Sequence, residues 1–209
     1  MDPLLPAPAE HWPLYTLTDT DRLARVSRGT AKRWLWGGEL STRPQTATFL
    51  DLVEIIVVGK LKQRGFPLSL IRHIEQTTRQ WLGVERPLVS TQFLVGGSDI
   101  FIKVENQLIE VGRHRGQTVW QEVLAPFLKD LDYHEGLASA WWPRGHQGYV
   151  QVSPHFGYGF PVIAGSGVRT EILRERYVAN DPIDLIAQDF RLDPLAVEAA
   201  LRYELQESA

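Results

Sequence analysis

A short segment beginning at Thr18 has the residue types and spacing that DNA recognition requires. Thr18 is expected to cap a first helix, and Asp19 and Asp21 place negative charge in its first turn. After a four-residue break ending in glycine, a second helix is expected to begin at Thr30. The candidate contacts to phosphates and base edges are Arg28, Thr30, Lys32, Arg33, Trp36 and Arg43. A plain helical hairpin with a solvated basic face produces the same pattern.

The charge distribution favours contact with a polyanion. From Arg22 to Arg86 the chain has twelve Lys and Arg against five Asp and Glu, whereas the remaining residues have ten against twenty. A basic segment within a chain of net charge −3 indicates a localised contact with a polyanion. The absence of cysteine excludes disulfides, zinc-thiolate sites and a cysteine nucleophile.

The sequence does not favour an enzyme or a membrane protein. The six histidines lack metal-ligand spacing and no nucleophile–base pair is evident, so we expect no catalytic residue, metal or cofactor. Gly165-Ser166-Gly167 lacks the Lys and Ser/Thr of a phosphate-binding loop and predicts a turn. The longest apolar stretch, residues 50–58, is too short and too charged to span a bilayer. The start is broken by prolines and is unlike a signal peptide, so we expect residues 1–12 to be a flexible leader and the protein to be cytoplasmic.

Residues 13–86 are expected to form the DNA-binding domain. Residues 39–48 are polar and predict a loop or short wing after the second helix. Helical spacing predicts a helix over 49–64 and another from 66 to about 83. The apolar side of the latter is expected to hold Leu68, Ile71, Ile74 and Trp81.

Residues 87–155 are expected to be a compact α+β region for dimerisation or linkage. Three alternating segments, 89–95, 100–104 and 107–111, predict a small β-meander. A helix is expected over about 119–131, followed by a strand or edge near 141–154.

Residues 156–209 are expected to end in a module of three short helices. Asp181-Pro182 and Asp193-Pro194 each predict an N-cap followed by proline at the first helical position. From Gly165 onward the chain has five basic and nine acidic residues. This excess of negative charge disfavours phosphate binding and favours a protein partner, ideally a basic one.

Two motifs resemble known domains. The pattern Tyr15-Thr-Leu-Thr, Leu23-Ala-Arg and Thr30-Ala-Lys-Arg-Trp-Leu resembles the MerR-like helix-turn-helix. The segment 161–203 is similar to a small three-helix domain of bacterial antitoxins, departing from it at 178–181, where that domain usually has a glycine-containing turn. Together they make the chain resemble a VapB-type antitoxin paired with a PIN-like ribonuclease toxin.

The resemblance implies an α+β protein with three parts: a winged MerR-like domain, a central β-meander with a helix, and a three-helix module. It implies repression of the chain's own operon through operator DNA and neutralisation of the toxin by the C-terminal part. The expected toxin contacts are Arg169, Arg174, Arg176, Tyr177 and Phe190. The acidic module would bind a basic rim of the toxin, or Arg169 or Arg176 would pair with its acidic metal ligands. Both modes remain open.

A homodimer is expected because palindromic operators match two-fold symmetric proteins. The helix over 49–61 and the central strands are its candidate surfaces, although packing within the domain explains the helix as well. Two other functions fit the sequence. One is a stand-alone MerR-like regulator in which residues 88–209 sense a small molecule, and the other is an adaptor that does not contact DNA.

Overall fold

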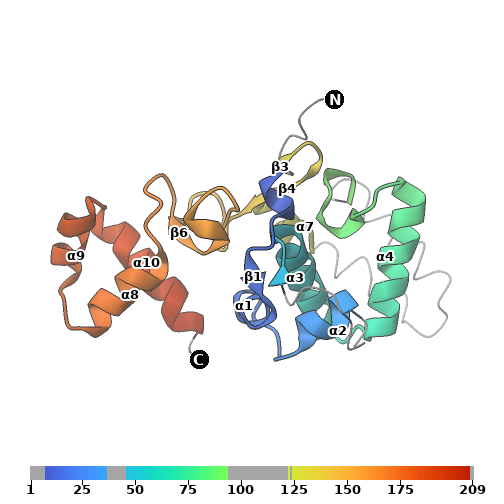
Figure 1. Cartoon of the computed structure of the whole chain (residues 1–209), viewed down its shortest axis with the longest axis horizontal. Coiled ribbons are helices and arrows are strands. Elements are labelled where there is room, and N and C mark those ends of the chain that lie inside the picture. Colours follow the sequence, from blue (N-terminus) through green and yellow to red (C-terminus); the bar gives the residue numbers. More distant parts are fainter. Residues whose placement is uncertain (1–7, 37–45, 94–121, 123, 208–209) are drawn as a thin grey trace, which may run out of the picture.

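Helices gather at both ends of the molecule, with short strands between them (Figure 1). The computed structural model describes residues 8–36, 46–93, 122 and 124–207. Helix predominates in these ranges, and the strands pair as three small antiparallel sheets, β1 with β2, β3 with β4, and β5 with β6. This is a mixed architecture consistent with the expected α+β class.

The N-terminal part contains η1 (Ala9–His11), β1 (Tyr15–Thr16), α1 (Leu17–Leu23), α2 (Thr30–Trp36) and β2 (Thr46–Ala47). The cap of α1 is Thr16, and the prediction of Thr18 was wrong. The Thr16 hydroxyl accepts a hydrogen bond from the Asp19 amide, and the Asp19 carboxylate accepts one from the Thr16 amide. This reciprocal pair satisfies two amides that the first helical turn leaves unbonded.

The central helix is α3 (Phe49–Gln63), followed by α4 (Leu68–Leu82), close to the predicted bounds. Residues on every side of α3 are buried, and it packs against α1, α2, α4 and β4, which explains its near-continuous apolar sequence. Its burial within the chain makes it unsuitable as a dimer surface. In α4 the apolar stripe includes buried Ile71 and Ile74, but Trp81, predicted on the same side, is 49% exposed.

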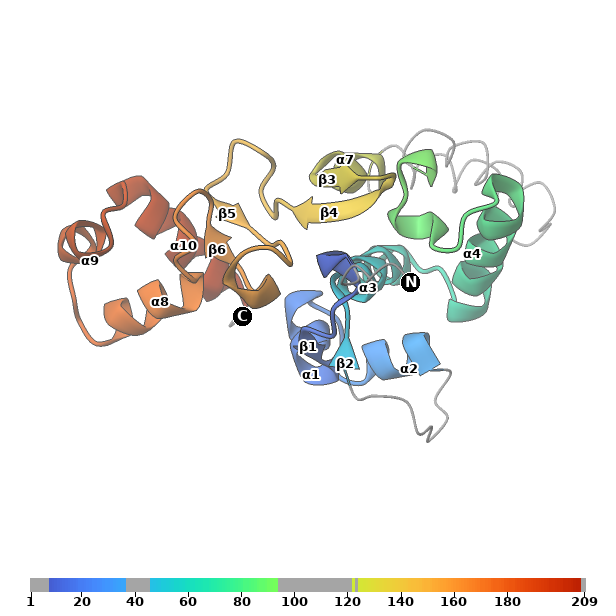
Figure 2. The ribbon, with the colours of Figure 1, turned by 45° about the horizontal axis from the view of Figure 1, so that its top comes forward.

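The central region differs from the predicted meander where the structure describes it. Residues 87–93 form the 3-10 helix η2 (Pro87–Val89) and a helical turn, so the strand predicted from 89 was wrong over these residues. The strands predicted at 100–104 and 107–111 lie outside the described residues. The predicted helix is seen as α7 (Ala125–Lys129), ending where an unpredicted hairpin begins, β3 (Leu131–His134) and β4 (Leu137–Trp141). This hairpin lies over α3 (Figure 2).

The remaining elements connect two hydrophobic clusters. The strands β5 (Val150–Gln151) and β6 (Val162–Ile163), with η4 (Gly157–Gly159) between them, link the first cluster to a second one inside the three C-terminal helices. The first cluster includes both α3 and the central hairpin, so the predicted segments 13–86 and 87–155 share one core. The boundaries between the four predicted segments remain predictions.

The C-terminal module contains α8 (Thr170–Val178), α9 (Ile183–Phe190) and α10 (Pro194–Glu207), as expected. The Asp193 carboxylate caps α10 by accepting from the Leu195 amide, 2.9 Å away. Asp181 does not cap α9, where Pro182 occupies the cap position. Asn180 has a φ of +71°, and its left-handed conformation ends α8 in place of the usual glycine.

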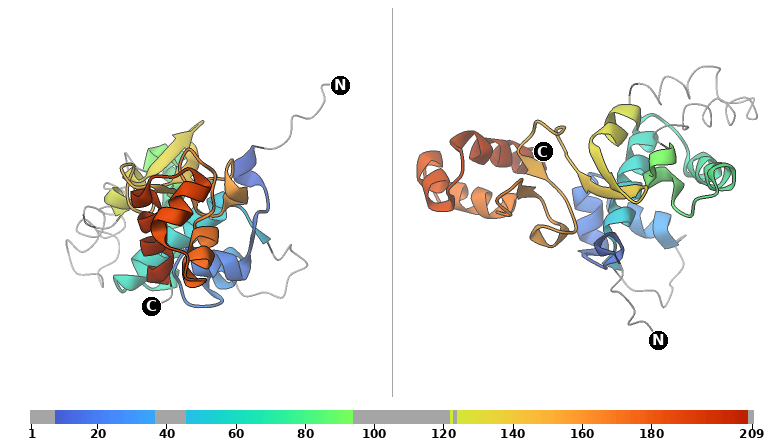
Figure 3. Two further views of the ribbon diagram at one scale, coloured as in Figure 1. Left: turned by 90° about the vertical axis from the view of Figure 1, so that its left-hand side faces the viewer. Right: turned by 90° about the horizontal axis from the view of Figure 1, so that it is seen from above.

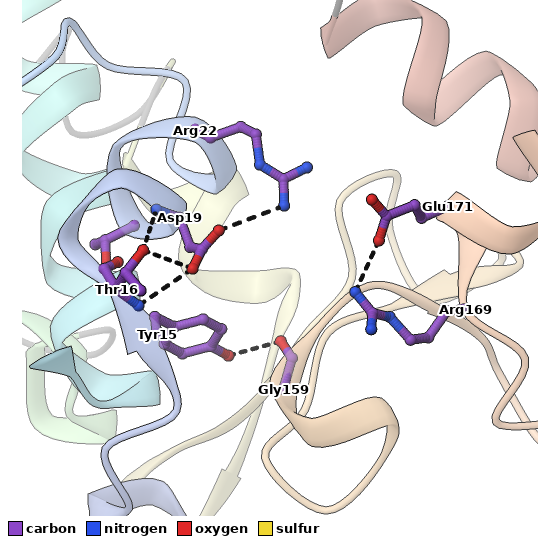
Figure 4. Close-up of polar contacts among 8 residues, drawn as sticks. Tyr15, Thr16, Asp19, Arg22, Gly159, Arg169 and Glu171 are labelled. Carbon is purple, nitrogen blue, oxygen red and sulfur yellow. Dashed lines mark hydrogen bonds and ion pairs between the residues drawn. The ribbon is translucent and has the colours of Figure 1, made fainter. Parts of the chain in front are cut away.

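The segment between β5 and β6 contacts β1 of the N-terminal part. The Tyr15 hydroxyl donates to the Gly159 carbonyl at 2.6 Å (Figure 4). The Tyr15 ring also meets the Phe160 ring edge to face. The C-terminal module projects from one end of the molecule when seen from above (Figure 3). Among the described residues, no helix combines the length and apolar character that a membrane crossing requires.

Candidate functional site

The turn between α1 and α2 is fixed by one buried carboxylate. Asp21 accepts hydrogen bonds from the amides of Gly29 at 2.5 Å and Ala31 at 2.8 Å, so it binds the N-terminal end of α2. Asp21 was predicted to add charge to the first turn of α1, and its binding to α2 was not predicted. Because the carboxylate belongs to one helix and the amides to the start of the next, it fixes their relative orientation.

Close packing against α3 supports the same turn. A Cβ atom at Gly59 would lie 2.6 Å from the Val26 side chain, so a side chain at this position would displace the turn. Arg25 begins the turn with a φ of +53°, a conformation that a residue with a side chain adopts only when the surrounding structure holds it.

The structure places five of the six predicted DNA contacts on this turn and α2. Arg28 and Arg33 are exposed and Lys32 is partly exposed. Thr30 is buried, and its hydroxyl lies within hydrogen-bond distance of the Ser27 hydroxyl and the Arg33 guanidinium. Its position suits it to support the turn. Trp36 is the last residue of α2, with a side chain outside the description, and Arg43 lies outside the described residues.

Arg72 of α4 contacts α2, and the sequence did not predict this role. Its guanidinium donates to the carbonyls of Arg33 at 2.9 Å and Trp34 at 3.0 Å and lies 5.0 Å from the centre of the Trp34 ring. These contacts satisfy carbonyls near the C-terminal end of α2 and anchor that end on α4. No local pattern indicates a partner 38 residues away.

A charged cavity of about 350 Å³ lies beside α2, α3 and α4. Arg86 forms ion pairs there with Asp51 and, at 3.5 Å, with Glu54. Burial raises the pKa of Glu54 to about 7; the nearby Arg86 lowers this pKa and Asp51 raises it, each by less. Glu54 therefore titrates near neutral pH, although nothing beside it forms a nucleophile–base pair in the described part of the chain.

The three arginines predicted to contact a toxin are already engaged within the C-terminal part. Arg169 pairs with Glu171 at 2.8 Å (Figure 4), and Arg174 lies 3.8 Å from the buried carboxylate of Glu204. Arg176 pairs with Asp181 and, at 2.7 Å, with Asp189, which joins α8 to α9. A partner that used Arg176 would have to compete with both carboxylates.

The exposed surface of this module is partly apolar, which the sequence reading did not predict. Tyr177, one of the predicted contacts, is 44% exposed, whereas Phe190 is partly buried with the Arg176 guanidinium 5.9 Å from its ring centre. The exposed large apolar side chains of the three helices are Ile172, Tyr177, Val178, Leu185, Leu195 and Leu205. Exposed side chains of this type suit a protein contact better than a nucleic-acid contact.

The described residues contain no group of three or more His, Asp or Glu side chains arranged to hold a metal ion. Of the six histidines, His146 contacts Asp132 at 2.8 Å and His155 contacts Glu10 at 3.4 Å. The Gly165-Ser166-Gly167 segment forms the predicted turn, closed by a hydrogen bond from the Ile163 amide to the Val168 carbonyl.

Comparison with known proteins gives a structure of similar fold and a related sequence. No protein-family model matches the chain. The crystal structure of Rv2018 from Mycobacterium tuberculosis has the same fold, with a TM-score of 0.76 and 23% identity, covering 91% of this chain and 98% of that one. A Mycobacterium tuberculosis (strain ATCC 25618 / H37Rv) protein named "Putative antitoxin VapB45" is 24% identical over 227 residues, covering 90% of this chain and 92% of that protein. The chain is thus similar to that protein along almost the full length of both.

Proposed function

We propose that this chain is a VapB-type antitoxin that neutralises a PIN-like ribonuclease toxin by direct binding and represses its own operon by binding operator DNA. The observation that carries the proposal is the similarity to a protein named as an antitoxin, which extends over 90% of this chain and 92% of that protein. The proposal gives the protein no enzymatic activity. A cytoplasmic location and a homodimer matched to a palindromic operator belong to the same proposal.

The DNA-binding half of the proposal rests on the turn and the start of α2. Arg28 and Arg33 are exposed, and Asp21 and Arg72 hold the two ends of α2. In helix-turn-helix proteins the N-terminal residues of the second helix approach base edges while nearby cations contact phosphates. We assign the contacts to phosphates and base edges to Arg28, Lys32 and Arg33. Thr30 is a positioning residue that supports the turn and the Arg33 side chain.

Gel-shift titration on the DNA upstream of the chain's own gene tests this half. Each phosphate contact adds about 0.9 to the slope of log affinity against log salt, so Arg28→Gln with Arg33→Gln should lower the slope by about 2 for each bound subunit, or about 4 for the homodimer. Arg202→Gln removes an exposed cation from α10 and is the matched control. An unchanged slope would remove both arginines from the interface. Failure of the wild type to bind at low salt, with or without toxin, would remove the repressor function.

The toxin-binding half rests on the acidic three-helix module and its exposed apolar side chains. Five bases and nine acids from Gly165 onward make contact with DNA phosphates unfavourable there. Exposed side chains such as Tyr177 and Val178 can be buried by a protein partner. Growth rescue and co-purification on co-expression with a PIN-like protein from the neighbouring gene test this half.

Two sets of variants distinguish the modes of toxin binding. Tyr177→Ala should weaken neutralisation, whereas the control Tyr158→Ala, which removes an 81% exposed ring outside the three helices, should not. Arg174→Glu and Arg176→Glu also break ion pairs within the module, so Asp189→Ala, which removes one partner of Arg176, is their control. Direct contact between these arginines and the toxin is supported if the arginine variants lose neutralisation and Asp189→Ala keeps it. Full neutralisation by both arginine variants removes them from the proposal.

A stand-alone regulator is the second candidate, favoured by a cation-lined cavity where the two hydrophobic clusters meet. An adjacent reading frame for a small PIN-like protein supports the antitoxin, and its absence supports the regulator.

A further inference from the structure

A cavity of about 350 Å³ lies between the N-terminal helices and the end of α10. Its lining comes from four separate places in the chain: the end of α1 and the following turn, one side of α3, the segment from β4 to residue 144, and α10. Leu23, Ile56 and Trp141 contribute apolar surface from the first hydrophobic cluster, and Tyr203 belongs to the second. The cavity therefore lies where the two clusters meet.

The charged residues that line this cavity are all cations, namely Arg25, Lys60 and Arg144. The Arg25 guanidinium lies 5.5 Å from the centre of the Tyr203 ring, which fixes the arginine beside α10. The Lys60 ammonium lies 5.0 Å from the Phe127 ring centre, and burial lowers its pKa, an effect opposed by Asp130. Desolvation of this ammonium makes an added anionic partner favourable.

The nearest carboxylates line a neighbouring cavity. That cavity, of about 370 Å³, shares Lys60, Gln63, Trp141 and Pro143 with the first and includes Asp130 and Glu122. Glu122 lies 3.5 Å from Arg64, so its charge is opposed there. Lys60 stands between the two cavities, with anionic groups on one side and the cations Arg25 and Arg144 on the other.

We propose that the first cavity binds a small, multiply charged anion carrying phosphate or carboxylate groups. Its volume lies in the range of small-ligand sites, which is roughly 300–1,000 Å³. Arginine forms paired hydrogen bonds with phosphate or carboxylate oxygens, and a lysine adds a compact charge. The apolar side chains beside the cations strengthen these interactions because they lower the local dielectric. Tyr203 is almost fully buried, and one face of its ring lies beside Arg25, so charge recognition is favoured over ring stacking.

A bound anion would join the C-terminal module to the DNA-binding part. Arg25 belongs to the turn between α1 and α2 and Lys60 belongs to α3, whereas Tyr203 belongs to α10. The ligand would stabilise this arrangement in proportion to its affinity for it. The inference goes beyond the proposed antitoxin function and does not depend on it.

Thermal unfolding and calorimetric titration of the full chain test the site. The probes are sodium pyrophosphate, ATP without added metal, and citrate, each at constant ionic strength set with sodium chloride. A ligand at a hundredfold excess over its Kd should raise Tm by about 5 to 10 °C for a chain of this size. The test variant is Lys60→Gln with Arg144→Gln. The matched control is Arg202→Gln, which removes an exposed cation next to Tyr203 but outside the cavity lining.

The proposal expects saturable binding by the wild type and by Arg202→Gln, reduced at least tenfold in the double variant. Binding of pyrophosphate and ATP alone identifies a phosphate ligand, and binding of citrate alone identifies a polycarboxylate. The proposal is overturned if no probe gives a saturable shift beyond sodium chloride, or if the double variant binds as the wild type does. These measurements use neither toxin nor operator DNA. Their outcome is therefore independent of whether the antitoxin proposal holds.

Discussion

Replacement of Asp21 by alanine tests how α2 is held in place. The carboxylate is 6% exposed and accepts hydrogen bonds from two amides, those of Gly29 and Ala31. A hydrogen bond to a charged group contributes about 1.5–3 kcal/mol, and water can replace part of the Gly29 contact because that residue is partly exposed. We therefore expect Asp21→Ala to lower the free energy of unfolding by about 2–4 kcal/mol, more than an ordinary helix cap.

Asp193→Ala is the matched control for this change. Asp193 also caps a helix with its carboxylate, but it is exposed and binds one amide, that of Leu195. Its loss should cost about 0.5–1 kcal/mol. The two variants make the same substitution and differ in burial and in the number of amides left unbonded.

Urea unfolding measures the difference, with stability read from the midpoint when the slope is unchanged. Amide hydrogen exchange adds a local measurement, because the Gly29 and Ala31 amides should exchange faster in Asp21→Ala and stay protected in Asp193→Ala. Equal costs for the two substitutions, together with unchanged exchange at Ala31, would refute the role given to Asp21.

Three further predictions concern the buried polar groups. Tyr15→Phe leaves the buried Gly159 carbonyl without its 2.6 Å donor and should cost about 1–3 kcal/mol in thermal unfolding, whereas Tyr158→Phe, at an 81% exposed ring, should stay within about 0.5 kcal/mol. Gly159→Ala should cost about 2–5 kcal/mol, because φ is +82° and the new Cβ would lie 2.5 Å from the Tyr15 hydroxyl; a neutral result would contradict this packing. The free energy of unfolding of Glu54→Gln, relative to that of the wild type, should be about 3 kcal/mol higher at pH 8 than at pH 4.5. The folded-state pKa of about 7 lies above the unfolded value, so the wild type loses stability as pH rises through 7, and parallel pH curves for the two proteins would exclude a raised Glu54 pKa.

The N-terminal helices could be predicted because their local patterns agree with their packing. The apolar spacing over 49–64 and the stop at Gly65 place α3 within a residue or two of its observed bounds. The first cap was misplaced for a physical reason. Thr16 and Thr18 each precede an aspartate by three residues, and the structure selects Thr16 because Asp21 binds the start of α2. A local pattern does not reveal which of two equivalent caps has a competing partner.

Long-range contacts account for most of what the sequence did not predict. The alternation of apolar residues from Val89 suggests a strand, but Pro87 and Ser90 close a 3-10 turn there, with the Ser90 hydroxyl donating to the Pro87 carbonyl. Arg72 and Tyr15 have partners 38 and 144 residues away. Such pairs form only in the assembled fold. The sequence therefore shows which residue types are present but does not predict which of them are in contact.

The ion pairs of the C-terminal module change the expected character of its partner surface. Arg176 already has two carboxylate partners, so a toxin that captured it would have to replace both to gain net affinity. Exposed Tyr177 and Val178 at the end of α8 require no such exchange. Burial of apolar side chains should therefore supply most of the affinity, and the excess of acids should guide approach and exclude DNA. On this reasoning, toxin binding should depend weakly on salt while operator binding depends on it steeply, which separates the two proposed activities in one titration.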